Sequence, residues 1–94
     1  MENDELARHG LRAYEFGEFP VAVDFLKTLL DREPKLWTCR LYLAMSYLRM
    51  GEDSHARQEL NSINQYCTDQ SVKKKALDAL RSMNGFNEST QRTG

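Results

Sequence analysis

The chain has 94 residues, of which 40% are hydrophobic and 29% charged, and its formal net charge is −1 at pH 7. This balance favours one small soluble domain over a disordered chain, and it gives no electrostatic case for binding nucleic acid or an anionic membrane. No apolar run approaches the ~20 residues that cross a bilayer, and the acidic start lacks the apolar core of a secretory signal. We therefore expect a cytoplasmic protein.

The hydrophobic pattern predicts five helices and no strand, because apolar residues recur at helical spacing and nothing alternates with period two. The first helix is expected to begin at a cap on Asn3 or Asp4, whose short polar side chains can accept a hydrogen bond from a first-turn amide. It runs to about Phe16. Gly17 follows, and glycine readily takes the left-handed conformation that ends many helices.

The second and third helices follow in the same manner. The second is expected to begin near Phe19, with Pro20 in its first turn, where a missing amide hydrogen costs little, and to stop at Pro34. The third spans residues 37–50 and is apolar on most of its circumference, so it should lie in the middle of the domain with neighbours on several sides. Gly51 ends it.

The last two helices carry a narrower apolar stripe and a polar back. The fourth is expected to begin at a cap on Asp53 or Ser54, and the fifth after Thr68 or Asp69. Gly85 is expected to close the fifth helix. The remaining residues are mostly polar without an apolar period, which predicts a disordered tail.

A period of 34 residues runs through these elements. Gly17, Gly51 and Gly85 are separated by 34 and again by 34 residues. Their neighbours keep the same step: Glu18 recurs as Glu52, Ala22 as Ala56, Leu26 as Leu60, and Leu43 as Leu77. A fixed period of this length indicates a repeated supersecondary unit, which favours surface recognition over catalysis.

The repeated residues resemble the tetratricopeptide repeat (TPR) family, whose 34-residue unit is a helix–turn–helix. The pattern positions hold Gly10, Gly17, Ala22, Leu26, Leu29 and Pro34 in the first unit, and Leu43, Ala44, Tyr47, Gly51, Ala56, Leu60 and Ile63 in the second. The resemblance implies an all-α, right-handed superhelical array of two antiparallel helix pairs plus one solvating helix. Its parts are repeats 3–36 and 37–70, a capping helix 71–85 and the polar tail 86–94. His9, Ala13 and Thr68 depart from the family pattern, as end units tend to do.

In this family the first helix of each repeat lines a concave inner surface. The resemblance therefore implies a partner-binding face on these helices: Leu11, Tyr14, Glu15, Leu41, Met45, Leu48, Arg49 and Lys75, with Ala79 in phase on the last helix. Such an apolar face suits a partner helix or an extended peptide. In so short an array Leu41 and Leu48 are better explained as core, whereas Tyr14 and Met45 are the stronger candidates for contact with a partner.

Other chemistry finds little support in the sequence. His9 and His55 lack metal-ligand spacing with each other or with the cysteines, and no phosphate-binding loop or catalytic triad can be placed. We therefore expect no enzymatic activity, no cofactor and no metal. Some TPR domains grip acidic chaperone tails through lysines and asparagines, but the matching places here hold Ala7, Leu11 and Tyr42, so that ligand is rejected.

Three functional hypotheses remain. The first is a non-catalytic interaction module, an adaptor or small chaperone, that binds a partner helix or peptide on the concave face. The second is a homo-oligomeric structural component, since a short array with an exposed apolar end invites self-association. The third is a redox module that uses Cys39 and Cys67. The alternative interpretation, which we favour, is that both are inert, partly buried thiols. The run Lys73–Lys75 is interpreted as a solvated helix face, with an anion site as the alternative.

Overall fold

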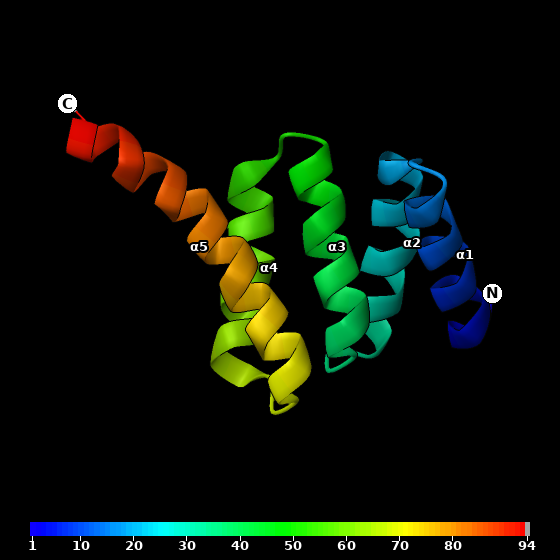
Figure 1. The fold of residues 1–94 in the computed structure, drawn as a ribbon. Helices are drawn as coiled ribbons and strands as arrows, with labels where there is room; N and C mark the ends of the chain where they lie inside the picture. The colour runs from blue at the N-terminus through cyan, green and yellow to red at the C-terminus, as the bar shows by residue number, and fades with distance from the viewer. Residues whose placement is uncertain (94) are drawn as a thin grey trace.

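Five α-helices in succession make up the fold, which confirms the all-α prediction (Figure 1). The computed structural model describes the backbone of residues 1–93 and the side chains of residues 1–84. The helices are α1 (Asn3–Glu15), α2 (Phe19–Arg32), α3 (Trp37–Arg49), α4 (Asp53–Tyr66) and α5 (Gln70–Thr93). The bounds of α1 to α4 lie close to those that the glycines and prolines of the sequence predicted.

Two equivalent turns separate the helices of each pair. Gly17 and Gly51 have φ angles of +79° and +77°, in the left-handed region that was expected of them. After each glycine, the backbone N–H of Glu18 or Glu52 donates to a carbonyl oxygen near the helix end, at 2.8 Å in both turns. These bonds satisfy carbonyl groups that a helix end otherwise leaves open. The 34-residue period therefore corresponds to two copies of one turn.

The N-terminal cap of α1 differs from the prediction. Glu2, rather than Asn3 or Asp4, precedes the helix, and its backbone N–H donates to the Glu5 side chain at 3.2 Å. The side chain of Asn3 is not free to cap because it bonds to the side chains of Arg32 and Glu33, at the end of α2. A tertiary contact has therefore displaced the cap that local preference favours.

The cap of α4 also differs from the prediction, whereas the cap of α5 agrees with it. Glu52 precedes α4 without a side-chain capping bond, and Asp53 is already the first residue of the helix, so the prediction of a cap on Asp53 or Ser54 is wrong. For α5 the prediction is confirmed, since Asp69 Oδ1 accepts the amide of Ser71 at 2.9 Å.

Helix α3 lies at the centre of the packing, as its apolar circumference predicted. It packs on α4 within its own pair and on α2 of the preceding pair, and it makes smaller contacts with α1 and α5. Its residues Leu43 and Tyr47 belong to a core cluster shared with α1 and α2, whereas Leu41 and Ala44 belong to one shared with α4 and α5. One helix thus joins the two cores.

Small residues sit where paired helices cross. A Cβ atom at Gly10 would lie 2.8 Å from Cδ2 of the fully buried Leu26, so α1 and α2 approach more closely than any other residue allows without a shift. Ala44 occupies the equivalent place in α3, and it is fully buried. Close packing of this kind is sensitive to the addition of a single methyl group.

The last helix extends further than the sequence predicted. The backbone of α5 continues past Gly85 to Thr93, and in Figure 1 this part projects beyond the other helices. Glycine weakens a helix by only about 1 kcal/mol relative to alanine, and no proline follows to break it. The side chains of residues 85–94 and all of Gly94 lie outside the described part of the chain. The disorder expected of the tail, residues 86–94, stays a prediction. Among the residues that the structure describes, none of the helices is both long and apolar enough to cross a membrane.

Candidate functional site

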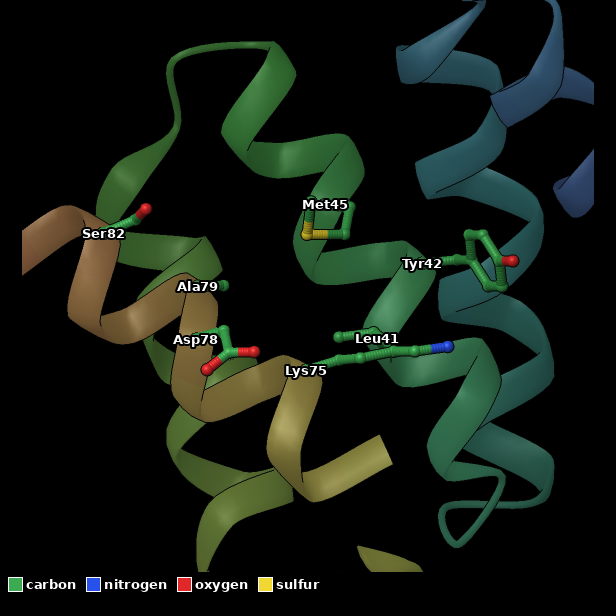
Figure 2. Close-up of a pocket in the computed structure, with 7 residues that line it drawn as sticks. All are labelled: Leu41, Tyr42, Met45, Lys75, Asp78, Ala79 and Ser82. Carbon is green, nitrogen blue, oxygen red and sulfur yellow. The ribbon is translucent and has the colours of Figure 1, made fainter. Parts of the chain in front are cut away.

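A concave feature lies between α3 and α5 (Figure 2). A hollow of about 420 Å³ is lined by three residues of α3 and four of α5: Leu41, Tyr42, Met45, Lys75, Asp78, Ala79 and Ser82. A second hollow, of about 740 Å³, shares Met45, Ala79 and Ser82 with the first and continues along both helices. It adds Leu48, Arg49, Asp53, Arg57 and Met83. Because the two hollows share three residues, they form one surface, which we call the α3–α5 groove.

The floor of the groove is a stripe on one face of α3. Leu41, Met45 and Leu48 are separated by four and three residues, which places them on the same side of a helix over about 10 Å. Leu41 is only 8% exposed and belongs to the core. Met45 and Leu48 are half-buried and pack against that same core from the groove side. The floor is therefore apolar and held in place from below.

The groove is open because α5 presents short side chains towards α3. Ala79 and Ser82 stand three residues apart on α5, where longer side chains would fill the space between the helices. Figure 2 shows the Met45 thioether pointing into this space, and the Tyr42 ring turned away from α5 towards α2. The depth of the groove thus follows directly from residue size on one helix.

Charged side chains border the groove at both ends. Lys75 and Asp78 lie at one end, and in Figure 2 the Lys75 side chain extends from α5 towards α3. Asp78 lies 3.6 Å from Lys74 in an exposed ion pair, whereas Lys75 has no ion-pair partner among the described residues. A partner in the groove would therefore meet one unpaired positive charge at this end.

The other end of the groove has a more constrained border. The Arg49 guanidinium carbon lies 5.0 Å from the centroid of the Phe19 ring. Arg57 Nη1 donates to Asn84 Oδ1 at 2.8 Å. Both cations are held by contacts within the protein, with Asp53 beside them in the lining. This end presents fixed charges of both signs.

The structure brings together most of the residues that the resemblance assigned to partner binding. Leu41, Met45, Leu48, Arg49 and Lys75 all line the groove. Leu11, Tyr14 and Glu15 of α1 do not. Tyr14 instead packs edge to face against Phe19 and Tyr42, with ring centroids 5.6 and 5.1 Å away. Within this fold Tyr14 is a contact between α1 and α3.

Several lining residues were not singled out from the sequence. Asp78, Ser82 and Met83 lie on the same helix as Lys75 and Ala79, and the helical phase of those two residues could have indicated them. Asp53 and Arg57 belong to α4, which the repeat pattern assigns to the outer layer. Nothing in the sequence alone indicates that the start of α4 reaches the end of the groove.

The two cysteines are separate free thiols. Cys67 is buried in the core cluster that α3 shares with α4 and α5. Cys39 is half-buried against the cluster that α3 shares with α1 and α2. Burial, and to a smaller extent the charge of Glu33, raises the pKa of the Cys39 thiol. Within the part of the chain that the structure describes, no three His, Cys, Asp or Glu side chains come together in a way that could hold a metal ion.

Comparisons of the chain with protein-family models, with curated proteins and with solved structures give no match. The interpretation of the groove therefore depends on the sequence period and on the geometry of the helices.

Proposed function

We propose that this protein is a non-catalytic interaction module of the TPR type, which holds a segment of another protein in the α3–α5 groove as an adaptor or small chaperone. The equivalent turns at Gly17 and Gly51 support the repeat assignment, as does the order in which α1 to α5 pack. In this proposal α1–α4 form two antiparallel pairs of a right-handed array, and α5 is the solvating helix.

The observation that carries the proposal is the apolar floor of the groove. Met45 and Leu48 are half-buried side chains on an open surface, supported by core residues and bordered by charge. Such a stripe, left without a partner helix, is the kind of surface that binds an amphipathic segment. Met45 adds adaptability, because its unbranched thioether adjusts to the shape of a ligand.

The dimensions of the groove favour a short helix as the partner. The stripe from Leu41 to Leu48 extends for about 10 Å, which is two turns of an α-helix but only about three residues of extended chain. A helix with apolar residues at i, i+3 or i+4, and i+7 would cover the stripe. An acidic residue at one end of that helix would meet Lys75.

The homo-oligomer alternative finds less support. It would use either an exposed apolar N-terminal end or the groove itself, and at the N-terminal end Leu6 is only 4% exposed. Leu11 and Tyr14 are half-buried within the fold. Self-association through the α3–α5 groove is the form of this alternative that remains.

A peptide selection tests the proposal. A displayed library of short helical peptides is panned against the full chain, and enriched sequences should carry the i, i+3/i+4, i+7 apolar pattern. Binding of an enriched peptide should weaken at least about tenfold with Met45→Glu, which places a charge on the floor. The conservative Met45→Leu should keep both binding and fold. A failure to enrich any such pattern, or equal binding by a folded Met45→Glu variant, would refute groove binding.

A further inference from the structure

A separate hollow lies at the opposite end of the helices from the two glycine turns. It has a volume of about 600 Å³ and forms where the α2–α3 connection meets the end of α4. Figure 1 shows that this connection and the α4–α5 connection share one end of the molecule. The hollow shares no residue with the α3–α5 groove. We call it the Trp37 pocket, and its lining includes Pro34, Lys35, Trp37, Arg40, Ser62 and Tyr66.

Flat apolar surfaces form much of the Trp37 pocket. Trp37 is half-buried, and Tyr66, on the last turn of α4, is 64% exposed. Pro34 adds a third ring from the α2–α3 connection. A tyrosine ring left so exposed beside a tryptophan is available to pack against a ligand, because aromatic side chains bury large areas at little cost in conformational entropy.

Arg40 holds the pocket in a fixed shape. Its Nη1 atom lies 2.7 Å from Glu59 Oε1, and its Nη2 atom donates to the Pro34 carbonyl oxygen at 2.8 Å. Its guanidinium carbon lies 5.6 Å from the centroid of the Trp37 ring. One side chain therefore connects the α2–α3 connection, α3 and α4 behind the pocket. A preformed site of this kind loses less freedom when a ligand binds.

The polar groups of the lining can all donate a hydrogen bond, and the hydroxyl groups among them can also accept one. Lys35 carries an ammonium group and Trp37 an indole N–H, while Ser62, Tyr66 and Thr68 carry hydroxyl groups. No carboxylate belongs to the lining, which consists entirely of described residues. Lys35 makes no ion pair within that part of the chain. The pocket is therefore positive, rich in donors and flanked by aromatic rings.

We propose that the Trp37 pocket binds a proline-rich segment of another protein in the polyproline II conformation, with an acidic residue of that segment beside Lys35. Proline has no backbone N–H, so such a segment offers carbonyl acceptors without donors that would need partners. Its rings pack on aromatic surfaces, and its conformation is largely formed before binding. One turn, of three residues, is about 9 Å long, which suits a pocket of this size. The protein then holds two different segments at two separate surfaces.

The fluorescence of Trp37 tests this inference directly, because it is the only tryptophan of the chain. The full chain is titrated with a peptide of about ten prolines that ends in two aspartates, and with a glycine–serine peptide of the same length and charge. The proline peptide should produce a saturable change in emission below about 2 mM, and the glycine–serine peptide should not. No saturable change, or an equal response to both peptides, would overturn the proposal.

Three variants locate the binding. Tyr66→Ala should weaken binding of the proline peptide about tenfold, whereas Tyr66→Phe keeps the ring and should stay within about twofold. Lys35→Glu should weaken the aspartate-ended peptide several-fold and leave an uncharged proline peptide unchanged. Both residues are exposed, and unfolding in urea checks that each variant is folded. Unchanged binding by a folded Tyr66→Ala variant would contradict the assignment. Met45→Glu should have no effect here, so this test and the test of the groove fail independently.

Discussion

The ring of Tyr14 in α1 meets the ring of Tyr42 in α3 edge to face, with their centroids 5.1 Å apart. The ring of Phe19, at the start of α2, also packs against the Tyr14 ring, with their centroids 5.6 Å apart. This arrangement joins α1 and α2 to α3 on the side where the sequence predicted a partner-binding face. The position of Tyr14 is therefore explained by contacts within the protein, which changes how a variant at this site should be interpreted.

We expect Tyr14→Ala to lower the free energy of unfolding by about 1–3 kcal/mol. The ring is half-buried and makes two aromatic contacts, each of which adds about 0.5–1.5 kcal/mol beyond the buried area. Tyr14→Phe keeps both contacts and should cost less than about 0.5 kcal/mol. Urea unfolding followed by circular dichroism measures both values. A Tyr14→Ala variant as stable as the wild type would show that the ring is not a structural contact.

The two glycine turns allow a test of the repeat itself. Gly17→Ala and Gly51→Ala should each lower the free energy of unfolding by about 1–2 kcal/mol, because both residues have left-handed φ angles. No atom outside the immediate chain lies within 4 Å of a Cβ at either position, so the cost is one of backbone conformation alone. Asparagine tolerates this conformation better, so Gly17→Asn should cost less than Gly17→Ala. Clearly unequal costs at the two turns would argue against their equivalence.

The success of the sequence in predicting these turns has a local cause. A glycine after an apolar helical stripe favours a left-handed turn, since the requirement lies within a few residues of chain, although the backbone of α5 continues past Gly85. The cap of α1 could not be predicted in this way. Asn3 is the better local cap, but its side chain bonds to Arg32 and Glu33 about 30 residues further along the chain. That competition is visible only once α1 and α2 are packed.

The residues of the α3–α5 groove also divide into those that the sequence could predict and those that it could not. Helical phase was enough to place Leu41 and Met45 on one face of α3, because the spacing of residues along a helix is fixed. The prediction for Tyr14 required the offset between α1 and α3, which sets the contact with Tyr42. The presence of Arg57 in the lining similarly depends on how α4 and α5 pack. Offsets between helices arise from the fit of many side chains and leave no periodic signal in the sequence.

The Arg40–Glu59 pair should contribute measurably to stability. Their side chains are only 17% and 20% exposed, and Nη1 and Oε1 lie 2.7 Å apart. Arg40→Leu should cost about 2–3 kcal/mol, because it leaves the Glu59 carboxylate and the Pro34 carbonyl oxygen without a donor. Glu59→Gln retains an acceptor and should cost only about 1 kcal/mol. A double-mutant cycle of Arg40→Leu with Glu59→Ala, each of which removes the interaction, should give a coupling of about 1 kcal/mol or more when measured by urea unfolding. Additive costs would show that the pair is not coupled.

The environment of Cys39 predicts a stability that falls in alkali. Burial and Glu33 raise the pKa of the folded thiol above its ordinary value of 9.0. As the pH rises past about 9, the unfolded chain therefore loses this proton before the folded chain does, and the free energy of unfolding decreases. The Cys39→Ser variant lacks this ionisation, so its stability relative to the wild type should improve between pH 8 and 10. Unfolding in urea across this range measures the difference, and a constant difference would contradict the raised pKa.

The same raised pKa argues against the redox hypothesis. The thiolate is the reactive form of cysteine, and a thiol that stays protonated near neutral pH is a poor nucleophile. Cys39 should therefore react with iodoacetamide at pH 8 several-fold more slowly than the thiol of a short unstructured peptide. Cys39 and Cys67 are both free thiols in the structure. If mild oxidation cross-linked the two thiols rapidly in the folded chain, the interpretation of both as inert would be wrong.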